Sequence, residues 1–188
     1  MLERGFKSWA ERTSLSLRHD LEISPDAPLS PACLADYLNV RLATPRDIPG
    51  LSQAVLHQLL VDDPWGWSAV SVFKEDTALV IYNPRHSAGR QASDIMHELA
   101  HLILDHQPAT IIISQDGGIV MRSYNQKQED EANWLGWCLL LPREALWRCK
   151  RLRLSVDEIA ERYGVTATLV SFRLRMTGVE AQMRAASG

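Results

Sequence analysis

The sequence is poor in cysteine and has no long apolar run. Its 188 residues include three cysteines, none of them in a CxxC pair. An odd number without paired spacing argues against a disulfide framework or a cysteine zinc site, so Cys33, Cys138 and Cys149 are expected to be reduced thiols. No apolar run approaches the roughly 20 residues of a membrane span. Residues 1–22 lack the apolar segment of a secretory signal. We therefore expect a cytoplasmic protein.

Net charge is also small, at −3, but it is unevenly distributed. From Arg143 onward there are nine Lys and Arg against five Asp and Glu, whereas the first 142 residues carry eleven against eighteen. A basic tail can contact nucleic acid or an acidic protein surface, or it can simply be a solvated helical face. The 46% hydrophobic and 23% charged residues are typical of a globular protein with one core.

Hydrophobic periodicity predicts helices around a small sheet, which is the α+β class. The predicted helices span residues 1–20, 31–38, 51–60, 93–106 and 128–141. The runs SAVSVF and TALVIYN predict a β-hairpin over residues 68–83. Two further short strands are predicted in ATIIIS and GGIVMRS, residues 109–114 and 117–123.

Residues 94–106, DIMHELAHLILDH, contain the pattern H-E-x-x-H. His97 and His101 are four residues apart and fall on one helical face, so both can reach a single ion. Glu98 can face the same cleft and contact a metal-bound water, which is the geometry of a zinc peptidase. Ser93 is the expected N-cap. The alternative is a helix that carries two histidines without a metal.

A catalytic zinc takes three protein ligands, so a third donor must come from another element. The segment QKQEDEANWLGWCLLLP supplies three adjacent acids. Glu129 is favoured because it shares a helical face with small residues, Ala132 and Gly136, that permit close packing against the histidine helix. Glu131, about 200° away around the helix, is the reserve, and Asp130 is shorter and less well aimed. Alternatively, these acids only complement the helix macrodipole.

The paired motifs H-E-L-A-H and E-D-E-A-N-W-L-G-W-C-L-L-L-P resemble the ImmA/IrrE family of zinc metallo-endopeptidases over residues 31–146. The resemblance implies an intracellular peptidase, of a kind encoded in bacteria and mobile genetic elements, and several relatives cleave a cognate DNA-binding repressor. It assigns His97, His101 and Glu129 as ligands of one Zn²⁺ and Glu98 as the catalytic residue. The family usually has Phe-Ala where this chain has Leu135-Gly136.

In the implied mechanism, zinc lowers the pKa of bound water toward about 7, and Glu98 transfers that proton to the leaving amine. An additional donor should stabilise the developing oxyanion. Tyr124, His106 and His86 are possible donors, although each can equally be structural. Asp94 or Asp105 is a candidate for orienting a ligand histidine, with a surface or capping role as the alternative.

The C-terminal segment LSVDEIAERYGVTATLVSFRLRM resembles a helix-turn-helix. Ile159 and Ala160 are expected to face inward, Gly164 to form the turn, and Thr166 to cap the second helix. The side chains that this second helix offers to DNA are Ser171, Arg173 and Arg175. Packing or partner docking is the alternative role. We predict a zincin-like metallopeptidase core with N-terminal helices over residues 1–146 and a helix-turn-helix-like segment over 147–188.

Two functions remain open from the sequence. The first is a zinc endopeptidase that cuts a protein substrate such as a transcriptional repressor. The second is a non-catalytic regulator that retains the fold, binds protein or DNA, and keeps a metal only for structure. The intact Glu98 favours the enzyme, because a structural zinc site does not need it.

Overall fold

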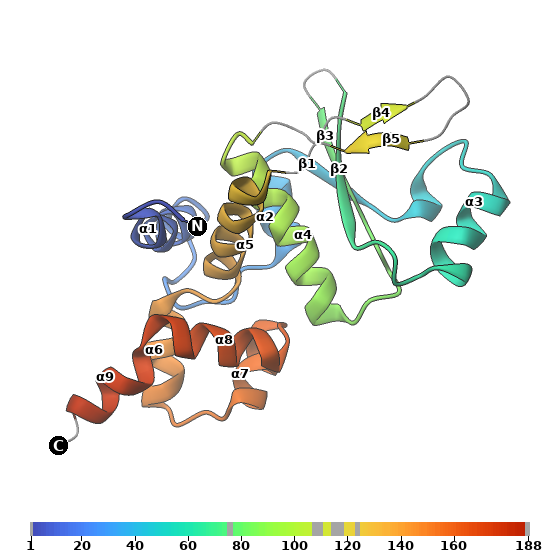
Figure 1. The fold of residues 1–188 in the computed structure, drawn as a ribbon. Coiled ribbons are helices and arrows are strands. Elements are labelled where there is room, and N and C mark those ends of the chain that lie inside the picture. The colour runs from blue at the N-terminus through green and yellow to red at the C-terminus, as the bar shows by residue number, and fades with distance from the viewer. Residues whose placement is uncertain (1, 75–76, 107–110, 114–118, 123–124, 187–188) are drawn as a thin grey trace.

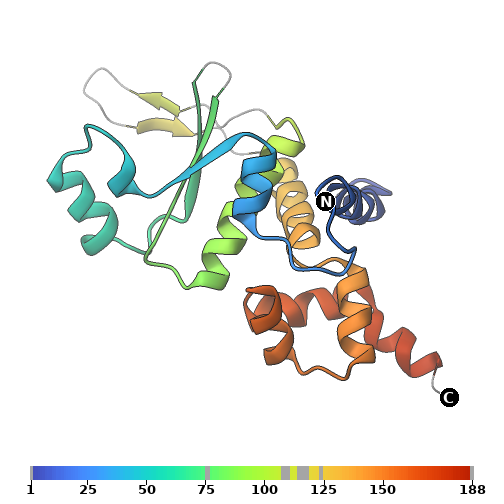
Figure 2. The same ribbon diagram turned by 180° about the vertical axis from the view of Figure 1, so that it is seen from behind.

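The computed structural model describes residues 2–74, 77–106, 111–113, 119–122 and 125–186. Figures 1 and 2 show a central pair of helices with a small sheet on one side and a group of C-terminal helices at the other end. This is the predicted α+β arrangement. The helices are α1 (Phe6–Asp20), α2 (Pro31–Tyr37), α3 (Gln53–His57), α4 (Ala88–Ile103), α5 (Gln126–Leu140), α6 (Arg143–Arg151), α7 (Val156–Tyr163), α8 (Ala167–Thr177) and α9 (Val179–Ala186).

The sheet contains three strands in the order β1-β3-β2. Strands β2 (Ala69–Lys74) and β3 (Thr77–Tyr82) pair antiparallel, which confirms the predicted hairpin. Strand β1 (Val40–Ala43) pairs parallel to β3 and was not predicted, because four residues directly after a helix carry too little alternation to identify a strand. The short strands β4 (Ile111–Ile113) and β5 (Ile119–Arg122) form a separate antiparallel pair, as expected.

Helix α4 begins earlier than predicted. Its N-cap is Ser87 in extended conformation, so Ser93 lies inside the helix and the expected N-cap is wrong. Gly89 lies in the first turn of this helix and abuts the turn between α7 and α8, where a Cβ would lie 2.8 Å from the backbone carbon of Val165. Gly89 is therefore required for close packing and is part of the helix, not of the loop that precedes it.

Helix α5 lies against α4 along its face of small residues. Ala132 and Gly136 are buried, and a Cβ at Gly136 would lie 3.3 Å from the carbonyl oxygen of Met96. Asn125 caps the start of the helix through its side-chain oxygen, and Pro142 follows its end. The predicted face of small residues therefore sets the distance between the two helices.

The C-terminal helices show the predicted helix-turn-helix features. Ile159 and Ala160 are buried, Gly164 adopts a left-handed conformation with φ 62°, and the Thr166 side chain caps α8. The predicted domain boundary after Leu146 falls within α6, and buried residues of α7 and α8 belong to the same hydrophobic cluster as those of α4 and α5. The division at this boundary stays a prediction.

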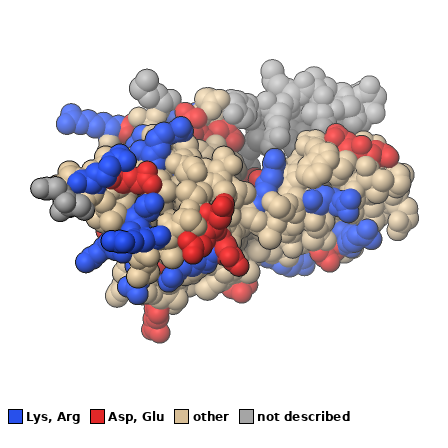
Figure 3. All heavy atoms as spheres, turned by 90° about the horizontal axis from the view of Figure 1, so that it is seen from below, with Lys and Arg blue, Asp and Glu red and all other residues tan. Residues whose placement is uncertain are grey.

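Arg173, one of the side chains that the second helix was expected to offer to DNA, is not available for that role. Its side chain is fully buried, with Nε donating to the Leu141 carbonyl at 3.0 Å and Nη2 to Glu11 at 2.6 Å. Ser171 and Arg175 are exposed and line a hollow between α8 and α9. Figure 3 shows this end of the molecule, where basic side chains are interspersed with acidic ones.

Helix α1 also holds the C-terminal end of α5. The Ser14 hydroxyl donates to the Cys138 carbonyl at 2.7 Å, and Arg18 donates to the Leu139 carbonyl at 2.7 Å. Burial lowers the pKa of the Arg18 guanidinium to about 10. These side chains satisfy carbonyls that have no partner within α5, because the last turn of a helix leaves them open.

The three cysteines are free thiols, as predicted. Cys33 is exposed, whereas Cys138 and Cys149 are buried. Burial raises the pKa of the Cys138 thiol to about 12, so this cysteine is an inert core residue. Within the described ranges, no helix is long and apolar enough to cross a membrane.

The buried Arg173 leads to a stability prediction. Arg173→Ala should lower the free energy of unfolding by about 3 kcal/mol or more, because it leaves the Leu141 carbonyl without its donor and removes the cationic partner of Glu11, which keeps only the Arg143 N–H. Arg175→Ala, on the exposed face of the same helix, should change it by less than about 0.5 kcal/mol. Denaturant unfolding of both variants measures the difference. Equal effects would contradict the structural role of Arg173.

Candidate metal centre

His97 and His101 lie on one face of α4, as their spacing predicts. Their Nε2 atoms are 3.0 Å apart, and their rings meet edge to face with centroids 4.6 Å apart. Both side chains are about one-fifth exposed, at 21% and 18%. Both rings are therefore partly accessible to solvent, and their Nε2 atoms lie close together.

Glu129 completes this cluster from the N-terminal end of α5. One carboxylate oxygen lies 3.3 Å from His97 Nε2 and the other 3.7 Å from His101 Nε2. The donor atoms of the three residues all lie within 4.8 Å of one another. Ligands about 2.1 Å from a tetrahedral zinc are roughly 3.4 Å apart, so this set of two imidazoles and one carboxylate fits such an ion.

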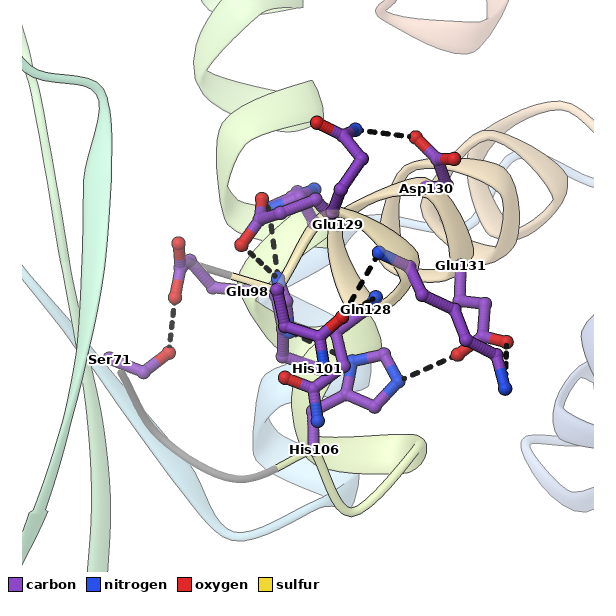
Figure 4. Close-up of polar contacts among 12 residues, drawn as sticks. Ser71, Glu98, His101, His106, Gln128, Glu129, Asp130 and Glu131 are labelled. Atoms are coloured by element: carbon purple, nitrogen blue, oxygen red, sulfur yellow. Dashed lines mark hydrogen bonds and ion pairs between the residues drawn. The ribbon is translucent and has the colours of Figure 1, made fainter. Parts of the chain in front are cut away.

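Glu131 and Asp130 point elsewhere, as Figure 4 shows. Glu131 Oε2 lies 3.3 Å from His106 Nε2, and its other oxygen lies 3.9 Å from Lys127. Asp130 accepts a hydrogen bond from Gln126 at 2.7 Å. Of the three acids that the sequence offers, Glu129 is therefore the one that faces both histidines.

Glu98 lies between the histidine cluster and the sheet. Its carboxylate accepts a hydrogen bond of 2.5 Å from the hydroxyl of Ser71 on β2 (Figure 4). Ser71 was not predicted from the sequence. Its only signal is its place in a strand where alternate side chains face the same side, and that pattern cannot show which helix the strand lies against.

The environment keeps His101 neutral. Burial first, and then the positive charge that the nearby rings of His97 and His106 can carry, lowers the pKa of His101 to about 4. Burial also lowers the pKa of His106, although Glu131 acts in the opposite direction. At neutral pH His101 is therefore unprotonated and has a lone pair for a metal ion.

The other predicted site residues are placed less favourably. Tyr124 lies outside the described residues. His86 is buried with Nδ1 2.8 Å from Asp94, and its ring stacks on Trp65. Asp94 also pairs with Arg90 at 3.7 Å, and among the described residues it contacts no histidine of the cluster. Asp105 is exposed just beyond α4.

His106, in contrast, contacts His101 directly, with 2.9 Å between their Nδ1 atoms.

Comparison with known proteins identifies the family. The family Peptidase_M78, described as the IrrE N-terminal-like domain, matches residues 62–175, more than half of the chain. The chain belongs to this family, which confirms the resemblance seen in its motifs. The matched region includes all four residues of the candidate site and extends into α8.

One solved structure, described as a Mycobacterium tuberculosis transcriptional regulator, has a similar fold. It aligns with a TM-score of 0.53 and 17% sequence identity over 92% of this chain and 47% of that one. The chain thus spans about half the length of that regulator, and at this identity the likeness concerns the fold alone. No curated protein sequence matches the chain.

The low pKa of His101 predicts how the metal-free chain responds to acid. The pKa is about 4 in the folded chain and near its ordinary value of 6.5 in the unfolded one. As the pH falls from about 6.5 to about 4, the unfolded chain binds the proton first, and the free energy of unfolding decreases. Denaturant unfolding in a chelator should show a smaller decrease for His101→Asn than for the wild type. An equally steep decrease in the variant would contradict this origin.

Proposed function

We propose that the chain is a zinc-dependent endopeptidase. The observation that carries this proposal is the convergence of His97, His101 and Glu129 next to Glu98, because a structural metal site needs no such carboxylate. Two imidazoles and one carboxylate are a donor set of catalytic zinc in peptidases, and a fourth position remains for water and substrate. Membership of a peptidase family supports the same conclusion.

A zinc ion in this site would supply a Lewis acid that polarises the scissile carbonyl and brings the pKa of water to about 7. Glu98 accepts the proton from the attacking water and returns it to the leaving amine. Ser71 on β2 donates to the Glu98 carboxylate and so fixes its position. His106 is unsuited to stabilise the oxyanion, because both of its ring nitrogens are engaged by His101 and Glu131.

For the substrate, we propose a protein such as a cognate DNA-binding transcriptional repressor, in the cytoplasm. The free thiols agree with a reducing compartment, and the family and the fold of a transcriptional regulator agree with a role in gene control. Residues 1–146 would form the peptidase core, and residues 147–188 would dock a partner. The burial of Arg173 counts against direct reading of DNA by α8.

Metal content tests the site. The purified wild type should contain about one zinc per chain, and Glu129→Ala should lose it, because a three-ligand site becomes a two-ligand one. Glu131→Ala should retain zinc at micromolar protein concentration, since its carboxylate faces His106 and not the ligand cluster. Elemental analysis after dialysis against buffer measures both. Zinc that persists in Glu129→Ala would exclude this ligand set.

Glu98→Gln separates the enzyme from the non-catalytic regulator. The variant should keep its zinc but lose at least about 100-fold in peptide hydrolysis, because it removes the general base without removing a ligand. Hydrolysis is measured as new protein N-termini formed when the wild type or the variant is added to a cell lysate of the source organism. New termini that also form with the variant, or a zinc-loaded wild type that forms none, would support the regulator.

A further inference from the structure

His106 forms the middle of a hydrogen-bonded chain that starts at His101. Its Nδ1 lies 2.9 Å from His101 Nδ1, and its Nε2 lies 3.3 Å from Glu131 Oε2. The side chains of His106 and Glu131 are 8% and 13% exposed, so the contacts are shielded from solvent. Figure 4 shows His106 on the side of His101 that faces away from Glu129.

The positions of the protons in this chain follow from the orientation of His101. Its Nε2 faces Glu129 and His97, so a metal there requires the lone pair of that nitrogen. The proton of the neutral ring then sits on Nδ1 and is donated to Nδ1 of His106. His106 in turn carries its proton on Nε2, where it donates to the Glu131 carboxylate. Each donor thus meets an acceptor, and only one arrangement of tautomers satisfies all three groups.

From this geometry we infer that His106 and Glu131 are positioning residues that hold His101 in the tautomer and orientation required for metal binding. The inference rests on the proposed zinc site. Outer partners of this kind fix a ligand ring and increase its basicity, and their loss typically weakens metal binding by about 10- to 100-fold. Glu131, the alternative third ligand considered from the sequence, is thereby assigned the role of orienting His106 and not of binding the metal.

The two ligand histidines differ in this support. Nδ1 of His97 is buried and has no hydrogen-bond partner among the described residues. His101 is therefore the candidate ligand whose orientation is fixed by hydrogen bonds between side chains, through His106 to Glu131. Helix α5 supplies both ends of the arrangement, because Glu129 faces the Nε2 side of His101 and Glu131 terminates the chain on its Nδ1 side.

A structural role is the competing explanation, since a buried His–Glu pair can stabilise the contact between α4 and α5. The two roles differ in how substitutions combine. If Glu131 acts on the metal through His106, its substitution has an effect only while His106 is present. A purely structural pair would alter the stability of the metal-free chain and leave zinc affinity nearly unchanged.

The test is zinc affinity, measured by competition with a chromophoric chelator for the full chain. His106→Leu should weaken zinc binding about 10- to 100-fold. His106→Asn should recover most of that loss, because its Oδ1 can occupy the position of the histidine Nδ1 and accept from His101. Glu131→Gln should weaken binding in the wild type but cause no further loss in His106→Leu, since coupled residues are not additive. Lys127→Met removes the ion pairs that Lys127 forms with Glu131 and Glu3 but leaves the contact between Glu131 and His106 in place, so it is the matched control and should bind within about twofold of the wild type.

The outcomes distinguish this inference from the proposed function. Loss of zinc in Glu129→Ala together with wild-type affinity in His106→Leu would overturn the inference and leave the zinc site standing. Equal losses in His106→Leu and His106→Asn, or additive losses for the two positions, would also overturn it. Zinc binding that does not depend on Glu129 would overturn the proposed site itself. Thermal unfolding in excess chelator identifies a variant that fails to fold, and His106→Asn then carries the test.

Discussion

The close packing of α4 against α5 is the constraint on which the site depends. The candidate ligands come from both helices, two from α4 and one from α5, and they converge only because the helices approach within the distance that Gly136 permits. Side chains of ordinary size at the contact would separate the helix axes and draw the Glu129 carboxylate away from the histidines. The same approach brings Glu131 to His106, so one packing contact sets both the ligand cluster and the chain of hydrogen bonds behind it.

This contact is held in place by buried polar groups at the far end of α5. The carbonyls of Cys138, Leu139 and Leu141 accept from Ser14, Arg18 and Arg173. Both arginines are fully buried: Arg18 makes four hydrogen bonds, and Arg173 makes two and is paired with Glu11, which offsets part of the cost of removing their charge from water. Interactions of this kind specify one geometry, because a small displacement of α5 would leave several buried donors without acceptors.

Local patterns in the sequence predicted much of the arrangement. The spacing of His97 and His101, the face of small residues beside Glu129 and the hairpin β2–β3 each depend on helical or strand periodicity, which neighbouring residues determine. The remaining features depend on contacts between distant segments. The pairing of β1 with β3, the bond from Ser71 to Glu98 and the burial of Arg173 have no local signature, since each needs the position of a second element.

Two expectations from the sequence differ from the structure because of contacts between distant segments. Ser93 was expected to begin α4, because a loop of Gly and polar residues precedes it, but the helix begins at Ala88 and its first turn packs through Gly89 against the turn at Val165. Arg173 was expected to face solvent on a candidate recognition helix, yet its partners come from α1 and from the end of α5. In both cases a tertiary contact overrode a reasonable local preference.

The bonds that hold the end of α5 also affect the order in which the chain can fold during synthesis. Helix α1 and all four candidate site residues are translated before Arg173, which lies 32 residues beyond the Leu141 carbonyl that it binds. Until that arginine has left the ribosome, the Leu141 carbonyl that follows α5 lacks its protein donor and Glu11 has only the Arg143 N–H, so α1 and α5 are held together by fewer bonds. A nascent chain that already contains its complete motif would therefore still lack one of the bonds that fix α5, and only synthesis of the C-terminal helices supplies it.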